Sequence, residues 1–169
     1  MIEIRWVHMD DARALGAVHA ESYRSVYQGI MSDDYLNQYT AAERESYFYQ
    51  ALVEGTEKIA LLSVDHLAVG CMILQACRDD DLLPGSGEIS AIYILHAYTG
   101  KGLGQQLLRW GIDRFVELGY GTAILWVLEA NRNAIRFYEK EGFVPDGKER
   151  TIHRGVPLAQ LRYRKALQF

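Results

Sequence analysis

Three glycines stand at alternate positions in the middle of the chain, Gly100, Gly102 and Gly104. Residues 88–95 before them form a short apolar run of β-favouring side chains, and the apolar residues after them recur at three- and four-residue steps. This pattern predicts a strand, a glycine turn and an amphipathic helix. A helix start carries unpaired N–H groups that glycine leaves accessible, so the turn is a candidate phosphate site. Glycines also form such turns without any ligand.

Two well-known phosphate-binding motifs do not fit this turn. It lacks the Gly-Lys-Ser/Thr ending of the nucleoside-triphosphate P-loop. It also lacks the Gly-x-Gly-x-x-Gly fingerprint of dinucleotide-binding proteins, and it lies in mid-chain rather than after a first strand.

Composition indicates an ordinary globular protein. The 169 residues predict one domain over residues 1–169, and the net charge of −4 gives no basic field for nucleic acid. No apolar run reaches the roughly 20 residues of a membrane span, and the first residues do not form a signal peptide, so we expect a cytoplasmic protein. Cys71 and Cys77 are too few for a disulfide framework, and neither they nor the scattered histidines have metal-ligand spacing, so no metal is expected.

The order of elements predicts an α/β fold, a mixed sheet covered by helices. The expected helices lie at residues 12–26, in a short segment after Ser32, and at residues 41–53, 102–118 and 131–141. The expected strands lie at residues 2–7, 58–64, 67–76, 88–95, 122–128, 143–151 and 158–167. Asp65 and His66 fit a two-residue hairpin turn, and Arg162 and Arg164 are expected on an exposed face of the last strand.

The N-terminal helical region is rich in aromatic residues, most of which we expect to be packing. Several of its tyrosines also fit a pocket for an organic cation. The aromatic residues are Tyr23, Tyr27, Tyr35, Tyr39, Tyr47, Phe48 and Tyr49.

Two separate segments resemble the GCN5-related N-acetyltransferase (GNAT) superfamily. Its cofactor signature, Gln/Arg-x-x-Gly-x-Gly/Ala, matches the chain at Gly102 and Gly104, while Thr99 replaces the usual first residue. Residues 131–143 resemble the family pattern Asn-x-x-Ala-x-x-Phe/Leu-Tyr-x-x-x-Gly-Phe. The two motifs occur in the expected order, and the likeness covers nearly the whole chain.

The resemblance implies a mostly antiparallel mixed sheet with a V-shaped gap. The gap would lie between the strand that ends near Leu95 and the strand that ends near Leu128. Acetyl-CoA, the cosubstrate of the family, would lie in this gap.

The resemblance also implies the contacts of this cosubstrate. Its pantetheine arm would pair with the backbone of Ile92, Tyr93 and Ile94 and touch Asn131. Lys101 is placed either to add a charged contact or to remain solvated. The residues implied at the pyrophosphate are Thr99, Gly100, Lys101, Gly102, Leu103 and Gly104.

Two residues match catalytic positions of the family. Glu88 lies six residues before Ile94, the spacing of the base in the histone-acetylating branch, and we expect the two on one face of the strand. Glu88 would act directly or through a water, or else be a structural carboxylate. Trp126 occupies the position at which enzymes that acetylate ribosomal N-termini carry a glutamate. Tyr138 matches the tyrosine that returns a proton to the leaving thiolate, with a core ring as the alternative.

The predicted activity is acetyl transfer from acetyl-CoA to a primary amine by direct attack in a ternary complex. The acidic balance and the tyrosines favour a small cationic amine over a peptide. The alternatives are a longer acyl donor and a non-catalytic acyl-CoA-binding sensor or interaction module on the same fold. Members of the family are often dimers, so a homodimer is also an expectation by analogy.

Overall fold

The computed structural model describes residues 1–82 and 84–168, and seven strands in this part of the chain form one sheet in the order β1-β2-β3-β4-β5-β7-β6. The pairing of β4 with β5 is parallel and the other pairings of this sheet are antiparallel. The sheet is therefore mixed and mostly antiparallel, as predicted. The strands are β1 (Ile2–Trp6), β2 (Lys58–Val64), β3 (Leu67–Ala76), β4 (Ser86–Ile94), β5 (Thr122–Leu128), β6 (Val144–His153) and β7 (Pro157–Ala166).

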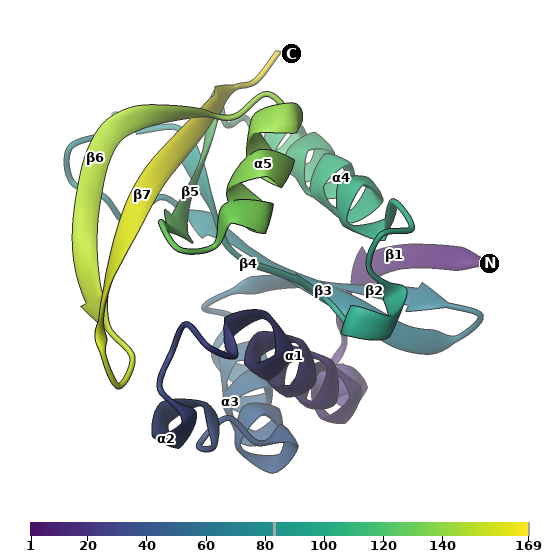
Figure 1. Ribbon diagram of the computed structural model, residues 1–169. Helices are drawn as coiled ribbons and strands as arrows, with labels where there is room; N and C mark the ends of the chain where they lie inside the picture. Colours follow the sequence, from purple (N-terminus) through teal and green to yellow (C-terminus); the bar gives the residue numbers. More distant parts are fainter. Residues whose placement is uncertain (83, 169) are drawn as a thin grey trace.

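Helices cover both faces of this sheet. In Figure 1, α1, α2 and α3 lie on one side, and α4 and α5 lie on the other. No helix in residues 1–82 and 84–168 combines the length and the apolar content that a membrane crossing requires. The α-helices are α1 (Ala12–Tyr27), α2 (Asp33–Leu36), α3 (Ala41–Glu54), α4 (Leu103–Glu117) and α5 (Arg132–Lys140).

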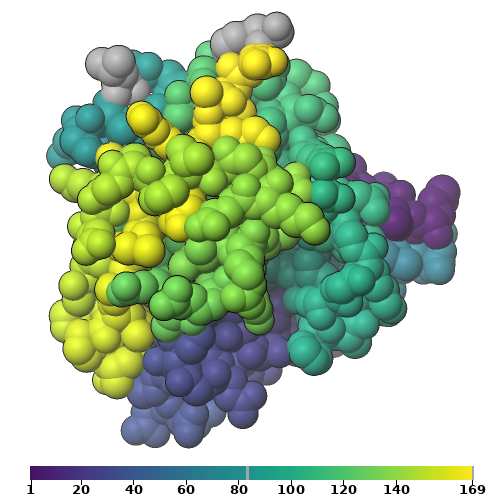
Figure 2. Space-filling view, turned by 45° about the horizontal axis from the view of Figure 1, so that its top comes forward, coloured from purple at the N-terminus to yellow at the C-terminus, as the bar shows by residue number. Residues whose placement is uncertain are grey.

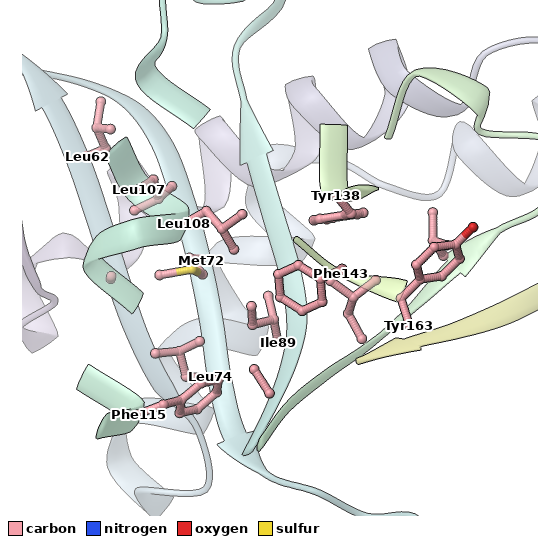
Figure 3. Close-up of a cluster of buried hydrophobic side chains, with 14 of the residues drawn as sticks. Leu62, Met72, Leu74, Ile89, Leu107, Leu108, Phe115, Tyr138, Phe143 and Tyr163 are labelled. Atoms are coloured by element: carbon pink, nitrogen blue, oxygen red, sulfur yellow. The ribbon is translucent and has the colours of Figure 1, made fainter. Parts of the chain in front are cut away.

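The apolar spacing of α4 produces the larger core. Leu107, Leu108 and Phe115 are at most 1% exposed and pack against the sheet with Met72 and Leu74 of β3 (Figure 3). A second cluster, between the other face of the sheet and α1 and α3, contains Leu15, Val18, Phe48, Ile59, Leu61, Cys71 and Ile73. Because β3 contributes alternate residues to both clusters, it is held between two helical layers.

Strands β4 and β5 separate part-way along their length. Residues Ser86–Ile89 of β4 pair with residues Thr122–Leu125 of β5, and the pairing ends there. Among the described residues, the remainder of each strand has no partner on the side that faces the other, so the predicted V-shaped gap is present.

A β-bulge in β4 changes which side chains face this gap. The register against β3 shifts between Ile73 and Leu74, which leaves Ser90 as the extra residue. Ile89 and Ile94 consequently pack on the face covered by α4. Glu88 lies opposite Gln75 of β3, on the face covered by α1 and α3. The prediction that Glu88 and Ile94 share one face is therefore wrong, because the bulge reverses the alternation between them.

The last strand corrects a second prediction. Arg162 is only 4% exposed, whereas Arg164 is exposed as expected. The Arg162 guanidinium donates to the carboxylates of Asp79 (2.9 Å), Asp81 (2.8 Å) and Asp146 (2.7 Å). These ion pairs hold the segment after β3 against strand β7. The segment covers the face of β7 that the alternation of the sequence alone predicts to be exposed.

Candidate active site

The gap between β4 and β5 opens into a cavity of about 820 Å³. Figure 2 shows this face of the molecule, where α5 (green) and the region of the glycine turn and α4 (teal) border a recess. The predicted site residues that line the cavity are Ile92, Tyr93, Ile94, Thr99, Gly100, Gly102, Gly104, Asn131 and Tyr138. Both family motifs therefore meet at one cavity.

The glycine turn has the geometry of an open cradle. Gly100 (φ 76°) and Gly102 (φ 78°) adopt the left-handed conformation that glycine favours, and Gly102 is the N-cap of α4. A Cβ on either residue would meet no atom within 4 Å, so the space above the turn is open. The Gln106 N–H donates to the Gly102 carbonyl, while the helical N–H groups before Gln106 have no acceptor within the helix. These residues fit a bound pyrophosphate.

Three other predicted residues of the turn contribute less to the cavity. The Thr99 hydroxyl donates to the His96 carbonyl at 2.7 Å, so the side chain that replaces glutamine or arginine stabilises its own turn. Lys101 does not line the cavity, and its ammonium lies 5.2 Å from the centre of the Tyr98 ring. Leu103 is the first residue of α4 and its side chain is buried in the larger core, so only its backbone amide is available to a ligand.

Tyr138 projects from α5 to the same cavity. Its ring is 9% exposed and packs beside Phe143 (Figure 3). Within residues 1–82 and 84–168, no hydrogen-bond partner is present for its hydroxyl, and burial raises its pKa. A phenol with a raised pKa remains protonated at neutral pH, which suits a proton donor. Asn131 caps the helix by accepting from the Ala134 N–H at 3.3 Å, which fixes the start of α5.

A second cavity, of about 290 Å³, adjoins the first on the side of α1 and α3. The residues that line both cavities are Tyr27, Ser90, Ala91, Tyr93 and Trp126. The Tyr27 and Tyr93 hydroxyls lie 3.0 Å apart at this junction, and burial raises the pKa of both. The sequence did not predict that Tyr27 or the side chain of Tyr93 would lie at this junction. The high tyrosine content of the N-terminal helices was the one sequence feature that indicated a pocket near Tyr27.

Glu88 lies beside the second cavity but does not line either cavity. It is 2% exposed, and its carboxylate accepts from the Arg78 guanidinium at 2.7 Å. Arg78 does line the second cavity. The carboxylate therefore contacts the cavity wall through Arg78, and the catalytic assignment of Glu88 stays a prediction.

The tyrosines of the second cavity are already in contact with a cation. Tyr23, Tyr39 and Tyr47 line this cavity, and the Arg44 guanidinium lies 4.5 Å from the centre of the Tyr39 ring and 4.4 Å from that of Tyr47. His19 is buried among these rings, and burial lowers its pKa to about 3, so the imidazole is neutral at pH 7. Arg150 and Arg154 also line the cavity, and no sequence motif marks them.

Comparison with known proteins assigns the family. Residues 12–143 match the model of the acetyltransferase (GNAT) family. The chain belongs to this family. The match and the relatives confirm the predicted family and enzyme class, an N-acetyltransferase whose cosubstrate is acetyl-CoA. No group of three or more metal-ligating His, Cys, Asp or Glu side chains occurs within residues 1–82 and 84–168.

Similar proteins agree with this assignment. An uncharacterised N-acetyltransferase, YuaI of Bacillus subtilis, is 27% identical over 82% of this chain and 78% of its own length. A spermidine N(1)-acetyltransferase of Thermoplasma acidophilum is 27% identical over 84% of this chain and 88% of its own. The PaiA N-acetyltransferase of Thermoplasma acidophilum, solved with coenzyme A, has a TM-score of 0.79 at 22% identity and covers 98% of this GNAT chain and 99% of its own.

Proposed function

We propose that this GNAT enzyme transfers the acetyl group of acetyl-CoA directly to the primary amine of a small molecule. The observation that carries the proposal is the junction of two cavities at Tyr27, Tyr93 and Trp126. The larger cavity suits the donor and ends at the glycine turn. The smaller one, at about 290 Å³, suits a small acceptor, although the end of a peptide would also enter it.

The proposed donor site uses the backbone more than side chains. The pyrophosphate lies on the amides of residues 100–104, where the helix dipole favours negative charge. The pantetheine arm pairs with the free backbone edge of β4 at Ile92, Tyr93 and Ile94, like an added strand. The Ile94 amide then polarises the thioester carbonyl, which stabilises the charge that develops on its oxygen.

The proposed chemistry needs one base and one acid. An amine attacks only when it is neutral, so Glu88 takes its proton through a water, because the carboxylate itself is covered by Arg78. The amine nitrogen bonds to the carbonyl carbon, and the carbon–sulfur bond then breaks. Tyr138 donates its proton to the thiolate that leaves, so that coenzyme A departs as a neutral thiol. The nitrogen loses its second proton as the amide forms, and this proton restores the Tyr138 phenol.

Three expectations from the sequence accompany this proposal. They are a single domain over residues 1–169, a cytoplasmic location and a homodimer. Sedimentation at several protein concentrations tests the dimer, and fractionation of the source cells tests the location.

Thiol release separates turnover from mere binding of the cosubstrate. Purified protein is incubated with acetyl-CoA and a panel of amines, free coenzyme A is measured with a thiol reagent, and the acetylated product is identified by mass spectrometry. Release that depends on one class of amine supports the proposal. Tight binding of acetyl-CoA with no release across the panel would instead support a sensor.

A further inference from the structure

The second cavity has an excess of positive charge. Among the described residues that line it, Glu57 is the one carboxylate, and its oxygen accepts from the Tyr47 hydroxyl. The chain as a whole carries a net charge of −4, so the positive charge of this cavity wall is opposite in sign to the net charge of the molecule. The arginines on the wall are Arg44, Arg78, Arg150 and Arg154.

Two of these arginines are neutralised by neighbouring carboxylates. Glu43 accepts two hydrogen bonds from Arg44, each 2.6 Å long, and Glu88 accepts from Arg78 at 2.7 Å. Arg150 and Arg154 differ, because neither forms an ion pair with any carboxylate in residues 1–82 and 84–168.

The guanidinium of Arg150 is held in a fixed position at the cavity wall. Its Nε donates to the Gln160 Oε1 at 2.7 Å, and the group lies 4.1 Å from the centre of the Trp126 ring, which lines both cavities. Within the described chain the two terminal nitrogens have no hydrogen-bond acceptor. They form the planar fork that binds a carboxylate with two parallel hydrogen bonds.

Arg154 lies four residues further along the chain, just after β6 ends, in the turn between β6 and β7. Its Nη1 donates to the His153 carbonyl at 2.8 Å, and its backbone carbonyl accepts from the Ser32 N–H, which joins the hairpin of β6 and β7 to the segment before α2. The pKa of Arg150 is lowered, chiefly by burial; Asp79 and Glu88 oppose this change, and the charges of Arg78 and Arg154 add to it. An anion between these guanidinium groups would relieve their mutual repulsion.

We propose that the acceptor of this enzyme is an amine that also carries a carboxylate, and that Arg150, assisted by Arg154, binds that carboxylate. The inference rests on the proposed function, because it takes the second cavity as the acceptor site. It disfavours the cationic amine expected from the sequence: the second ammonium of a polyamine would meet guanidinium groups, and Arg44 already covers the Tyr39 and Tyr47 rings.

The test compares acceptors that carry a carboxylate with acceptors that do not. Initial rates are measured for amino acids, for the carboxamides of the same amino acids, and for diamines and spermidine. We expect kcat/KM for the best amino acid to exceed that of its carboxamide by at least about tenfold, equivalent to about 1.4 kcal/mol. Diamines that outperform amino acids would overturn the inference.

Variants assign the effect to the arginine. Arg150→Gln should raise KM for the amino acid by about tenfold or more, leave kcat within about twofold, and reduce the preference for acid over carboxamide to near unity. Arg164→Gln, an exposed arginine on the adjacent strand, is the matched control and should keep the wild-type preference. An unchanged preference in Arg150→Gln would contradict the proposed role.

A separate binding measurement distinguishes failure of this inference from failure of the proposed function. If no amine of any class is acetylated, the proposed function is contradicted. Calorimetric titration of amino acids into the protein with coenzyme A then tests the carboxylate site by itself. Binding that Arg150→Gln weakens supports the site, and absence of binding overturns it.

Discussion

The Arg78 guanidinium donates to the Glu88 carboxylate across 2.7 Å, at the wall of the smaller cavity. The Glu88 side chain is 3% exposed, whereas the Arg78 side chain is 61% exposed, so the pair connects a buried carboxylate with an accessible cation. The β-bulge at Ser90 makes this contact possible, because it places Glu88 on the side of the sheet that faces α1 and α3. The predicted base, Glu88, therefore forms an ion pair with a residue that lines the cavity, Arg78.

Replacement of Glu88 by glutamine tests whether this carboxylate accepts a proton. Glu88→Gln should flatten the rise of kcat toward basic pH, because an amide of the same size cannot take a proton from the amine. Arg78→Gln is the matched control: it breaks the same ion pair but keeps the carboxylate, so its kcat should still rise with pH. A Glu88→Gln profile like that of the wild type would remove Glu88 from the mechanism.

Removal of the Tyr138 hydroxyl should slow the chemical step. Tyr138→Phe is expected to lower kcat by about 100-fold and to leave the dissociation constant of coenzyme A within about twofold, since the ring remains in place. Stopped-flow thiol release and calorimetry measure the two quantities. Wild-type turnover in the variant would show that another group protonates the thiolate.

The open space above the glycine turn can be filled without a steric clash inside the protein. Gly102→Ala should destabilise the fold by about 1–2 kcal/mol, because alanine is strained at φ 78°. It should also weaken coenzyme A binding by at least about tenfold, because the added methyl group would occupy the space proposed for the pyrophosphate. Gly119→Ala, at φ 87° and equally open, supplies the same strain away from the site. Equal coenzyme A affinity in both variants would place the pyrophosphate elsewhere.

Arg162 should be a major determinant of stability. Arg162→Met leaves the carboxylates of Asp79 and Asp146 without their cation, at an expected cost of about 3–5 kcal/mol. Arg164→Met, on the same strand but exposed, should change the free energy of unfolding by less than about 0.5 kcal/mol. Urea denaturation of the two variants measures the difference, and similar values would contradict the structural role of Arg162.

The same network predicts how stability depends on pH. Hydrogen bonds from Arg162 lower the pKa of Asp81 from its ordinary value of 3.8 to about 2. A lowered carboxyl pKa stabilises the fold fully above about pH 4, and this contribution is lost as the pH falls through about 2. The difference in urea midpoint between wild type and Asp81→Asn should therefore shrink between pH 5 and pH 2. A constant difference over this range would mean that Asp81 titrates normally.

Local patterns predicted the elements of the fold. Asp65 and His66 have φ values of 48° and 69°, as a two-residue hairpin turn requires, and the apolar spacing of α4 places Leu107 and Leu108 in the core. The turn at Gly102 begins α4 as expected. These features depend on residues close together in the sequence, so they can be recognised without knowledge of the tertiary structure.

Features that need several distant segments were not predictable in this way. The bulge at Ser90 depends on how β4 pairs with β3, and it reverses the face of Glu88. Arg162 alternates like an exposed residue, but the carboxylates of the segment after β3 cover it. The smaller cavity combines residues of α1, α3, β3, β4, β5 and the β6–β7 hairpin, so its arginines form a group only in the folded chain.

Direct transfer between two adjoining cavities is the central claim, and two-substrate kinetics tests it most directly. Initial rates of thiol release are measured while acetyl-CoA and the preferred amine are varied together. Direct attack predicts double-reciprocal lines that intersect, because both substrates are bound when the acetyl group moves. Parallel lines, together with an acetylated protein isolated in the absence of amine, would show transfer through the enzyme and contradict this account.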